Sequence, residues 1–338
     1  MLQQRLPRQW MQDFRQGGLH ALSHAGGEDH NVHMRSQKVE NMKKFNTPDT
    51  LIRRTVALWI VALFTLLTAC SSVKFTYNQG DTLLYWWLDS YADLEGEQAD
   101  IAKRDIDKLF QWHRQTQLRD YAALLGTMQR ELAGNPTQAD LINIYKEIRV
   151  RGERLASRAV PEMTTLALSI KPDQIADIER KFNAKNKEYR EKFIEGSVEK
   201  RQRARFKKAM EQLELWFGRF SSEQEDVLRR TMNARPLDND VWLEERIWRQ
   251  RRILTLLRKF QQEKPNREQA AAQITAMQRE LFGRMESPER KAFYDTSVDQ
   301  TTKFILTAIR LATPAQKKHA QERMQGWIND FQTLAANR

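Results

Sequence analysis

Residues 241–260 read VWLEERIWRQRRILTLLRKF, and this stretch decides the fold class. Its large apolar side chains recur at the spacing of one broad face of an α-helix. They are Val241, Trp242, Ile247, Trp248, Ile253, Leu254, Leu257 and Phe260. Mostly charged and polar residues stand between them, so the stretch predicts an amphipathic helix that packs by one stripe.

The rest of the chain from residue 70 onward has the same character. Ala, Leu, Glu, Gln, Lys and Arg dominate it, and these residues favour helix. Gly or Pro interrupts it at regular intervals. The sequence therefore predicts an all-α fold, a multi-helix bundle or array of about ten helices whose short connections make neighbours antiparallel. The expected ranges are 81–94, 97–133 (continuous or broken near 116), 137–158, 162–169, 172–194, 197–219, 222–234, 239–263, 266–285, 288–311 and 314–335.

Upstream of this region the chain carries an export signal. The basic pair Arg53-Arg54 precedes an apolar run that ends in Leu67-Thr68-Ala69-Cys70. A charged region, a short apolar run and a small-residue cleavage site make a secretory signal, and the run is shorter than the roughly 20 residues of a membrane-spanning helix. The last four residues resemble the bacterial lipobox. That resemblance implies cleavage before Cys70 and lipid on its thiol.

These signals divide the chain into three parts. Met42-Lys43-Lys44 looks like the true start, so 42–69 is a lipoprotein signal peptide and 70–338 a helical periplasmic domain. Residues 1–41 are a mis-annotated upstream extension or, if translated, a disordered segment. Ser71 follows the cysteine. In the familiar lipoprotein sorting system Asp there retains a protein at the inner membrane, so Ser implies the outer membrane, with the body facing the periplasm.

The composition of the chain limits the functions that it can have. Residues 1–69 hold nine of the 56 Lys and Arg and five of the 44 Asp and Glu, which leaves 47 and 39 and a net charge of +8 in residues 70–338. That excess does not require a nucleic-acid partner. Cys70 is the single cysteine, so no disulfide is expected. With only His113 and His319 downstream, no His/Cys metal site is expected. The region also lacks a nucleophile motif and a phosphate-binding loop. We therefore predict no catalytic residues, no metal and no cofactor.

One short pattern recurs. An apolar residue, a helix cap and a Gln follow one another in Leu168–Gln174, Phe220–Gln224 and Leu311–Gln316, with a weaker copy at Met285–Arg290. This pattern is typical of ordinary helix starts, where the apolar residue packs against the first turns. Alternatively, it resembles the Leu-Thr-Pro-x-Gln motif of small helical periplasmic stress chaperones.

Aromatic residues gather near the start of the mature chain. Within residues 84–91, Leu84, Trp87, Leu88 and Tyr91 share the expected inner side of a helix, whereas Trp86 points off that stripe with Tyr85 on its side. These aromatics form either a first core layer or a polar-edged groove for a peptide, lipid or glycan. The candidate contact surface is Tyr85, Trp86, Trp87, Trp112, His113 and Arg114.

Two basic stretches, 200–208 and 249–259, leave two interpretations open. Each is either a solvated helix face, because Lys and Arg stems cover apolar surface, or a contact with anionic lipid headgroups or wall polymer.

A set of segments behind the lipobox carries a family resemblance. The segments are Tyr77-Asn78-x-x-Asp81, Trp86-Trp87-Leu88-Asp89-x-Tyr91, Trp112-His113-Arg114, Phe182-Asn183-x-x-Asn186-x-x-Tyr189 and Leu237-Asp238-x-x-Val241-Trp242-Leu243-x-Glu245-Arg246. The set resembles the uncharacterised bacterial lipoprotein family called domain of unknown function 6279. The resemblance implies a helical periplasmic lipoprotein and brings no catalytic residues with it.

These observations lead to three functional hypotheses. The first is a non-enzymatic binding or scaffold protein, held to the membrane through Cys70, with an envelope protein, lipid or peptidoglycan as partner. The second is a periplasmic chaperone-like protein. The third, a peptidoglycan-active enzyme, is the least favoured, because no carboxylate is surrounded by the aromatic and Gly-rich motifs of such enzymes.

Overall fold

The computed structural model describes residues 72–336. Cys70, the signal at 42–69 and the segment 1–41 lie outside the described residues. Within that range the chain forms thirteen α-helices and one short 3-10 helix, and no strand, which confirms the all-α prediction. The helices are α3 (Ser72–Asn78), α4 (Gly80–Ala92), α5 (Glu97–Thr116), α6 (Leu118–Ala133), α7 (Gln138–Arg158), α8 (Val160–Ser169), α9 (Pro172–Phe193), α10 (Val198–Phe217), α11 (Ser222–Asn233), α12 (Asn239–Glu263), α13 (Arg267–Gly283), η1 (Arg284–Glu286), α14 (Lys291–Leu311) and α15 (Pro314–Ala336).

Most expected ranges agree with these bounds, with three differences. The long segment 97–133 is broken at Gln117, next to the expected position. Helix α3 was not expected. Helix α14 begins at Lys291 instead of 288, because η1 and a turn occupy Arg284 to Arg290. The weak copy of the recurring pattern, Met285–Arg290, ends at the N-cap residue of α14, so the helix begins three residues later than predicted.

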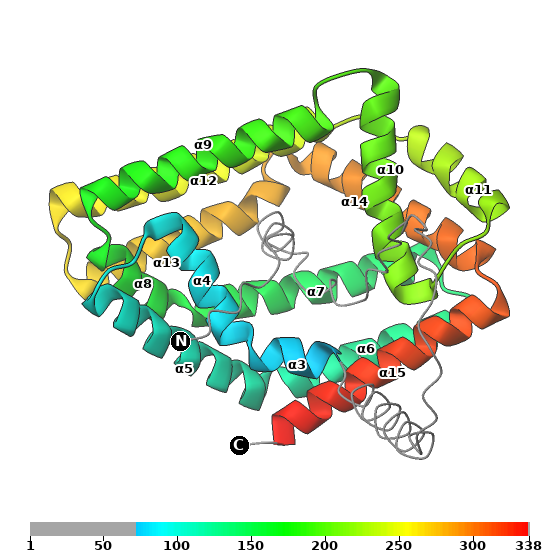
Figure 1. Ribbon diagram of the computed structural model, residues 1–338, viewed down its shortest axis with the longest axis horizontal. Coiled ribbons are helices and arrows are strands. Elements are labelled where there is room, and N and C mark those ends of the chain that lie inside the picture. Colours follow the sequence, from blue (N-terminus) through cyan, green and yellow to red (C-terminus); the bar gives the residue numbers. More distant parts are fainter. Residues whose placement is uncertain (1–71, 337–338) are drawn as a thin grey trace, which may run out of the picture.

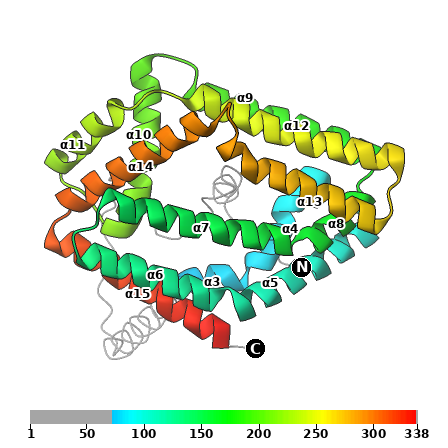
Figure 2. The same cartoon turned by 180° about the vertical axis from the view of Figure 1, so that it is seen from behind.

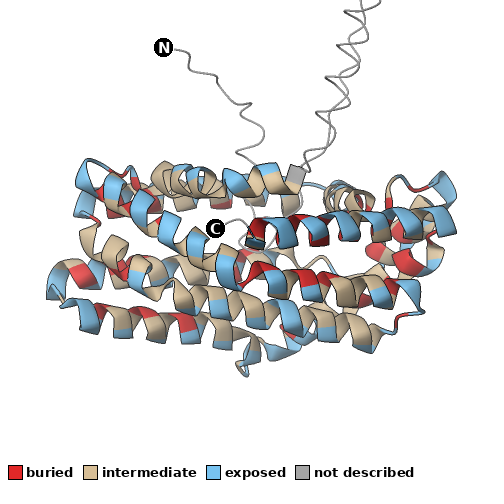
Figure 3. Ribbon diagram, turned by 90° about the horizontal axis from the view of Figure 1, so that it is seen from below, coloured by how far each residue is buried: buried red, intermediate tan, exposed pale blue. Residues whose placement is uncertain are grey.

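The helices pair in a nested order rather than with their sequence neighbours. The second half of the chain runs back along the first, so that α9 packs on α12, α8 on α13, α7 on α14 and α6 on α15. The sequential neighbours α4 and α5 also pack on each other, but most of the extensive contacts join helices that are far apart in the sequence. Figures 1 and 2 show the α9–α12 and α6–α15 pairs as opposite long edges of the molecule. Seen edge-on, the molecule is a flat slab (Figure 3).

The two halves of the structure repeat each other. If α4–α9 are matched in order with α10–α15, the main contacts correspond: α4 with α9 matches α10 with α15, and α6 with α15 matches α12 with α9. The pairs α5–α8 and α11–α14 match in the same way. In Figure 1 the two halves lie about the centre of the slab like the halves of a two-fold arrangement.

Helices α6 and α12 are exchanged between the two halves. The larger core combines buried residues of α6 with those of α10, α11, α14 and α15. The smaller core combines α4, α5 and α9 with Leu254 and Leu257 of α12, and Phe260 of α12 packs beside α13 and α8. Each core therefore depends on a helix from the other half of the sequence.

The recurring Gln pattern explains how the helix starts are joined. Gln174 accepts from the backbone N–H of Lys171 at 2.8 Å, and its amide donates to Gln98 at 2.9 Å and to the Asp93 carbonyl at 2.9 Å. In return Gln98 donates to the carbonyl of Ser169. Each side chain thus closes its own helix start and bonds the chain just before the other helix.

A second pair repeats this arrangement in the other half. Gln224 donates to Gln316 at 2.9 Å and to the Leu311 carbonyl at 2.7 Å. Gln316 donates to the Arg219 carbonyl at 2.7 Å. Both glutamines also accept from the backbone of their own N-cap residues. We name Gln98–Gln174 the first glutamine pair and Gln224–Gln316 the second.

The buried positions after these glutamines also correspond. Gln98 and Gln224 are each followed by buried side chains four and eight residues later. Gln174 and Gln316 are each followed by buried side chains four and twelve residues later. These residues are Ala102 and Leu228, Ile106 and Met232, Ile178 and Ala320, and Asn186 and Ile328. The interpretation of the pattern as a helix start therefore accounts for its recurrence. The sequence analysis did not predict the copy at Leu94–Gln98, because Gly96 interrupts it.

Candidate functional site

The first part of the expected contact surface is a half-buried polar cluster at the junction of α3 and α5. The Tyr77 hydroxyl lies 2.9 Å from Nδ1 of His113, and the His113 ring meets Tyr121 edge-on at 5.1 Å between centroids. Arg114 donates to Asn78 at 3.0 Å and lies over the Tyr77 ring. The cluster joins α3 to α5 and α6.

Burial sets the protonation of this cluster. It lowers the pKa of His113 to about 4, because the charged imidazolium loses its hydration. It raises the pKa of Tyr77 to about 12 for the same reason, against the opposing charge of Arg114. At neutral pH His113 is therefore a neutral imidazole hydrogen-bonded to the neutral phenol of Tyr77. The pair contributes to the packing of α3 against α5.

Trp112 has a different neighbourhood. The Arg158 guanidinium lies over its ring at 5.5 Å, and Arg158 in turn pairs with Glu162 at 2.9 Å. The indole therefore helps to hold α5 against the α7–α8 junction.

The aromatics of α4 lie apart from these two groups. Trp87 contacts Tyr91, which contacts Phe182 of α9. Tyr85 was expected on the outer side of the helix, but it packs against the smaller core beneath the Lys103 ammonium group. Trp86, expected off the inner stripe, is 45% exposed.

The six candidate residues thus occupy four settings along α4 and α5. His113 and Arg114 share one cluster, Trp112 contacts Arg158, and Tyr85 and Trp87 pack inward. Trp86 is the one that offers a largely free apolar surface. It shares this property with Phe75 of α3, which is 67% exposed and which the sequence analysis did not single out.

A buried charge cluster was also missed. The Glu245 side chain is fully buried, with Arg290 Nε at 2.7 Å and Arg284 at 3.4 Å from the same oxygen. The Tyr294 hydroxyl donates to the other oxygen at 3.1 Å. Burial and the nearby Glu245 carboxylate raise the pKa of Tyr294, which keeps this donor protonated. The cluster joins α12 to η1 and α14. Its one sequence signal was Glu245 itself, within the last family segment.

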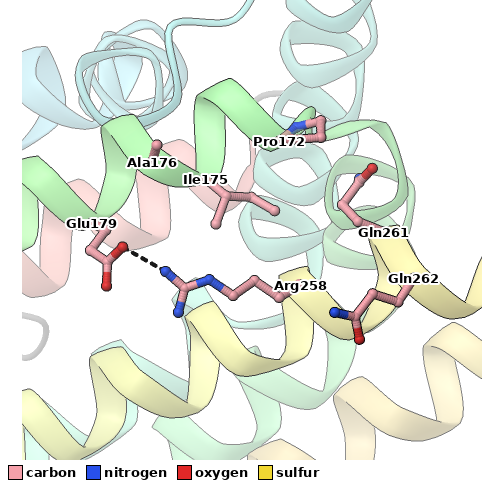
Figure 4. Close-up of a pocket in the computed structure, with 7 residues that line it drawn as sticks. All are labelled: Pro172, Ile175, Ala176, Glu179, Arg258, Gln261 and Gln262. Carbon is pink, nitrogen blue, oxygen red and sulfur yellow. Dashed lines mark hydrogen bonds and ion pairs between the residues drawn. The ribbon is translucent and has the colours of Figure 1, made fainter.

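A shallow groove lies between the start of α9 and the end of α12, with a volume of about 260 Å³. Figure 4 shows Ile175 at its floor and the ion pair between Arg258 and Glu179, 2.5 Å long, across one end. The remaining lining residues are Pro172, Ala176, Gln261 and Gln262. The groove contains no histidine or cysteine and no buried titratable pair.

Residues 72–336 contain neither a metal-binding cluster nor a helix that could span a membrane. No three His, Cys, Asp or Glu side chains there gather closely enough to hold a metal ion. None of the helices in this range combines the length and apolarity that crossing a bilayer requires.

Comparison with known proteins places the chain in a family. The model of a family of unknown function, DUF6279, matches residues 90–282, and the chain belongs to this family. Neither the curated proteins nor the solved structures contain a match to it.

Several of the family-like segments make interhelical contacts. Asn186 donates to Gln250 at 2.7 Å, and Tyr189 to Asn239 at 3.4 Å. Trp242 packs on Tyr294 beside Glu245. The segments 182–189 and 237–246 thus join α9 to α12 and α12 to α14, whereas Tyr77–Asp89 precedes the matched range.

Proposed function

We propose that this protein is a lipoprotein, anchored by lipid on Cys70 in the outer membrane, whose helical body faces the periplasm. The observation that carries the proposal is the lipobox-like Leu67-Thr68-Ala69-Cys70, placed directly before the helical body, whose first described helix begins at Ser72. Lipid on a mature N-terminus makes a firm attachment when it carries more than one acyl chain.

We further propose a non-enzymatic binding or scaffold role. The residues whose pKa values are strongly shifted have structural partners that account for their burial. Tyr77 and His113 form a hydrogen bond with each other, and Tyr189 contacts Phe193. Exposed large apolar residues, by contrast, occur on both sides of the slab. Phe75 and Trp86 belong to α3 and α4, whereas Ile148 and Val150 belong to α7, which lies on the opposite face. Exposed apolar side chains of this kind are candidate contact points for a partner.

The recurring Gln pattern no longer favours the chaperone-like alternative. The two glutamine pairs account for the three strong copies and for Leu94–Gln98 through helix–helix contacts, so the likeness to the chaperone motif needs no client-binding explanation. Aggregation suppression nevertheless separates the alternatives. A chaperone would protect an unrelated client at equimolar amounts, and a scaffold would not.

The anchor is tested by mass spectrometry of the native protein. We expect an N-terminus at Cys70 carrying diacylglycerol and an amide-linked acyl chain, and the Cys70→Ala variant should lose the lipid and stay unprocessed. The Ser71→Asp variant should keep the lipid and move to the inner membrane. An unmodified Cys70 still joined to residues 42–69 would refute the proposal.

The binding role is tested by photo-crosslinking in intact cells. A crosslinking amino acid at Ile148 or Val150 of α7 should capture a discrete partner, and one at the exposed Ala276 of α13 should not. Equal capture of many proteins at all three positions would contradict a specific scaffold.

A further inference from the structure

Three helices on one face of the slab carry exposed aromatic and exposed cationic side chains. Helices α3, α4 and α10 lie on the near side in Figure 1 and on the far side in Figure 2. The aromatics are Phe75 and Trp86. The cations are Lys200, Arg203 and Lys207, all exposed residues of α10.

The spacing of these cations places them together. Residues three and four apart lie on one side of a helix, so Lys200, Arg203 and Lys207 form a continuous basic stripe. Glu199 stands one turn before Arg203 and offsets part of one charge. Helix α10 is the counterpart of α4 in the repeated fold, so the helices that carry the basic stripe and Trp86 lie on the same face.

The attachment point of the chain lies beside this face. Helix α3 begins at Ser72, two residues after Cys70, and two extended residues span at most about 7 Å. Lipid on Cys70 would therefore hold α3 within about that distance of the bilayer. This step rests on the anchor proposed above.

We propose that this face, which we name the membrane face (Phe75, Trp86, Lys200, Arg203 and Lys207), rests on the bilayer that holds the anchor. Phe75 and Trp86 enter the interfacial region, where aromatic side chains are favoured. The α10 cations contact anionic phospholipid headgroups, which attract basic residues close to the surface. The body then lies flat on the membrane and turns the α7 face toward the periplasm.

A single labelled cysteine tests this orientation. Because the chain has one cysteine and lipid would occupy its thiol, a new cysteine gives the lipidated full-length mature protein one reactive site. We would attach a fluorophore at Thr82→Cys, one turn from Trp86, or at the exposed Ala276→Cys of α13, a helix on the near side in Figure 2, in vesicles containing phosphatidylglycerol. Quenching by a nitroxide-labelled lipid should be at least two-fold stronger at position 82, and 0.5 M NaCl or purely zwitterionic vesicles should reduce the difference.

Charge reversal supplies the matched control. Lys200→Glu, Arg203→Glu and Lys207→Glu together should lower quenching at position 82 to the level at position 276. Reversal of three exposed arginines of α13 and α14, helices on the near side in Figure 2, should leave it unchanged; they are Arg267, Arg279 and Arg310. All six side chains are exposed, and circular dichroism checks that both variants stay helical. Equal quenching at the two positions in protein with lipid on Cys70 would overturn the membrane face and leave the anchor intact. Protein without that lipid would overturn the anchor itself.

Discussion

Glu245 is a fully buried carboxylate whose two oxygens bond Arg290, Arg284 and Tyr294. Without Glu245, Arg290 and Arg284 keep only the exposed carboxylates Glu244 and Glu289 as partners, and losing one partner of a buried ion pair costs about 3–5 kcal/mol. We therefore expect Glu245→Ala to lower the free energy of unfolding by about that amount. Urea unfolding at pH 7 measures it.

The neighbouring residue supplies the control for this prediction. Glu244 also pairs with Arg290, at 2.9 Å, but its side chain is 63% exposed. An exposed pair contributes about 0–1 kcal/mol, so Glu244→Ala should change stability little. If both variants lowered the free energy of unfolding by similar amounts, the burial of Glu245 would not contribute to stability.

His113 makes stability depend on pH. Its pKa is about 4 in the folded protein and close to 6.5 in an unfolded chain, so the unfolded state binds the proton first. Stability is therefore unaffected above pH about 6.5 and falls as the pH drops from there toward 4. Between pH 7 and pH 5 the loss from this residue is about 2 kcal/mol.

The His113→Gln variant isolates this contribution. Other groups titrate in the same range, so the quantity to compare is the change in unfolding free energy between pH 7 and pH 5, in the wild type and in the variant. We expect the variant to lose about 2 kcal/mol less over this interval. Equal pH slopes would mean that His113 is hydrated in the folded protein.

At the scale of whole elements, the glutamine pairs couple helix starts that are far apart in sequence. Gln98 and Gln174 are 9% and 5% exposed, so losing one leaves buried polar groups of the other unsatisfied, at about 1–3 kcal/mol. In a double-mutant cycle Gln98→Ala and Gln174→Ala should be non-additive by about 1–2 kcal/mol. Gln98→Ala with Gln316→Ala, which belongs to the other pair, should be additive. Additivity in both cycles would show that the pairs do not act as units.

The elements were largely predictable from the sequence, because their signals are local. The stripe from Val241 to Phe260 and the caps at Ser221 and Thr313 depend on residues a few positions apart. The cross-contacts of Gln174 were not predictable. A glutamine three residues after an N-cap residue is fully explained as part of a capping box. No nearby residue indicates that its side-chain amide also donates to Gln98.

At the scale of the whole molecule, the sequence predicted the class of fold but not its pairing. Short connections suggested that neighbouring helices are antiparallel, yet the most extensive helix–helix contacts join α6 to α15 and α9 to α12. Such non-local pairs leave no mark on the apolar stripe of either helix, since a stripe specifies burial without specifying the partner. For the same reason the sequence did not show that Trp112 would pack against Arg158 of α7, or Tyr85 against the smaller core.

The exchanged helices make the two halves interdependent. Without α12, the first half loses Leu254, Leu257 and Phe260 from its cores. Burial of each contributes about 1.5–3 kcal/mol, so the loss, roughly 5–9 kcal/mol, is comparable to the whole stability of a typical domain, about 5–15 kcal/mol. We therefore expect fragments 70–195 and 196–338, separated at the exposed Gly196 between α9 and α10, to unfold without cooperativity when alone. Mixed, they should recover the helical signal and a single cooperative thermal transition, measured by circular dichroism. If either fragment melted cooperatively alone at the temperature of the intact protein, α6 and α12 would be accessory to the cores, and each half would be a domain in its own right.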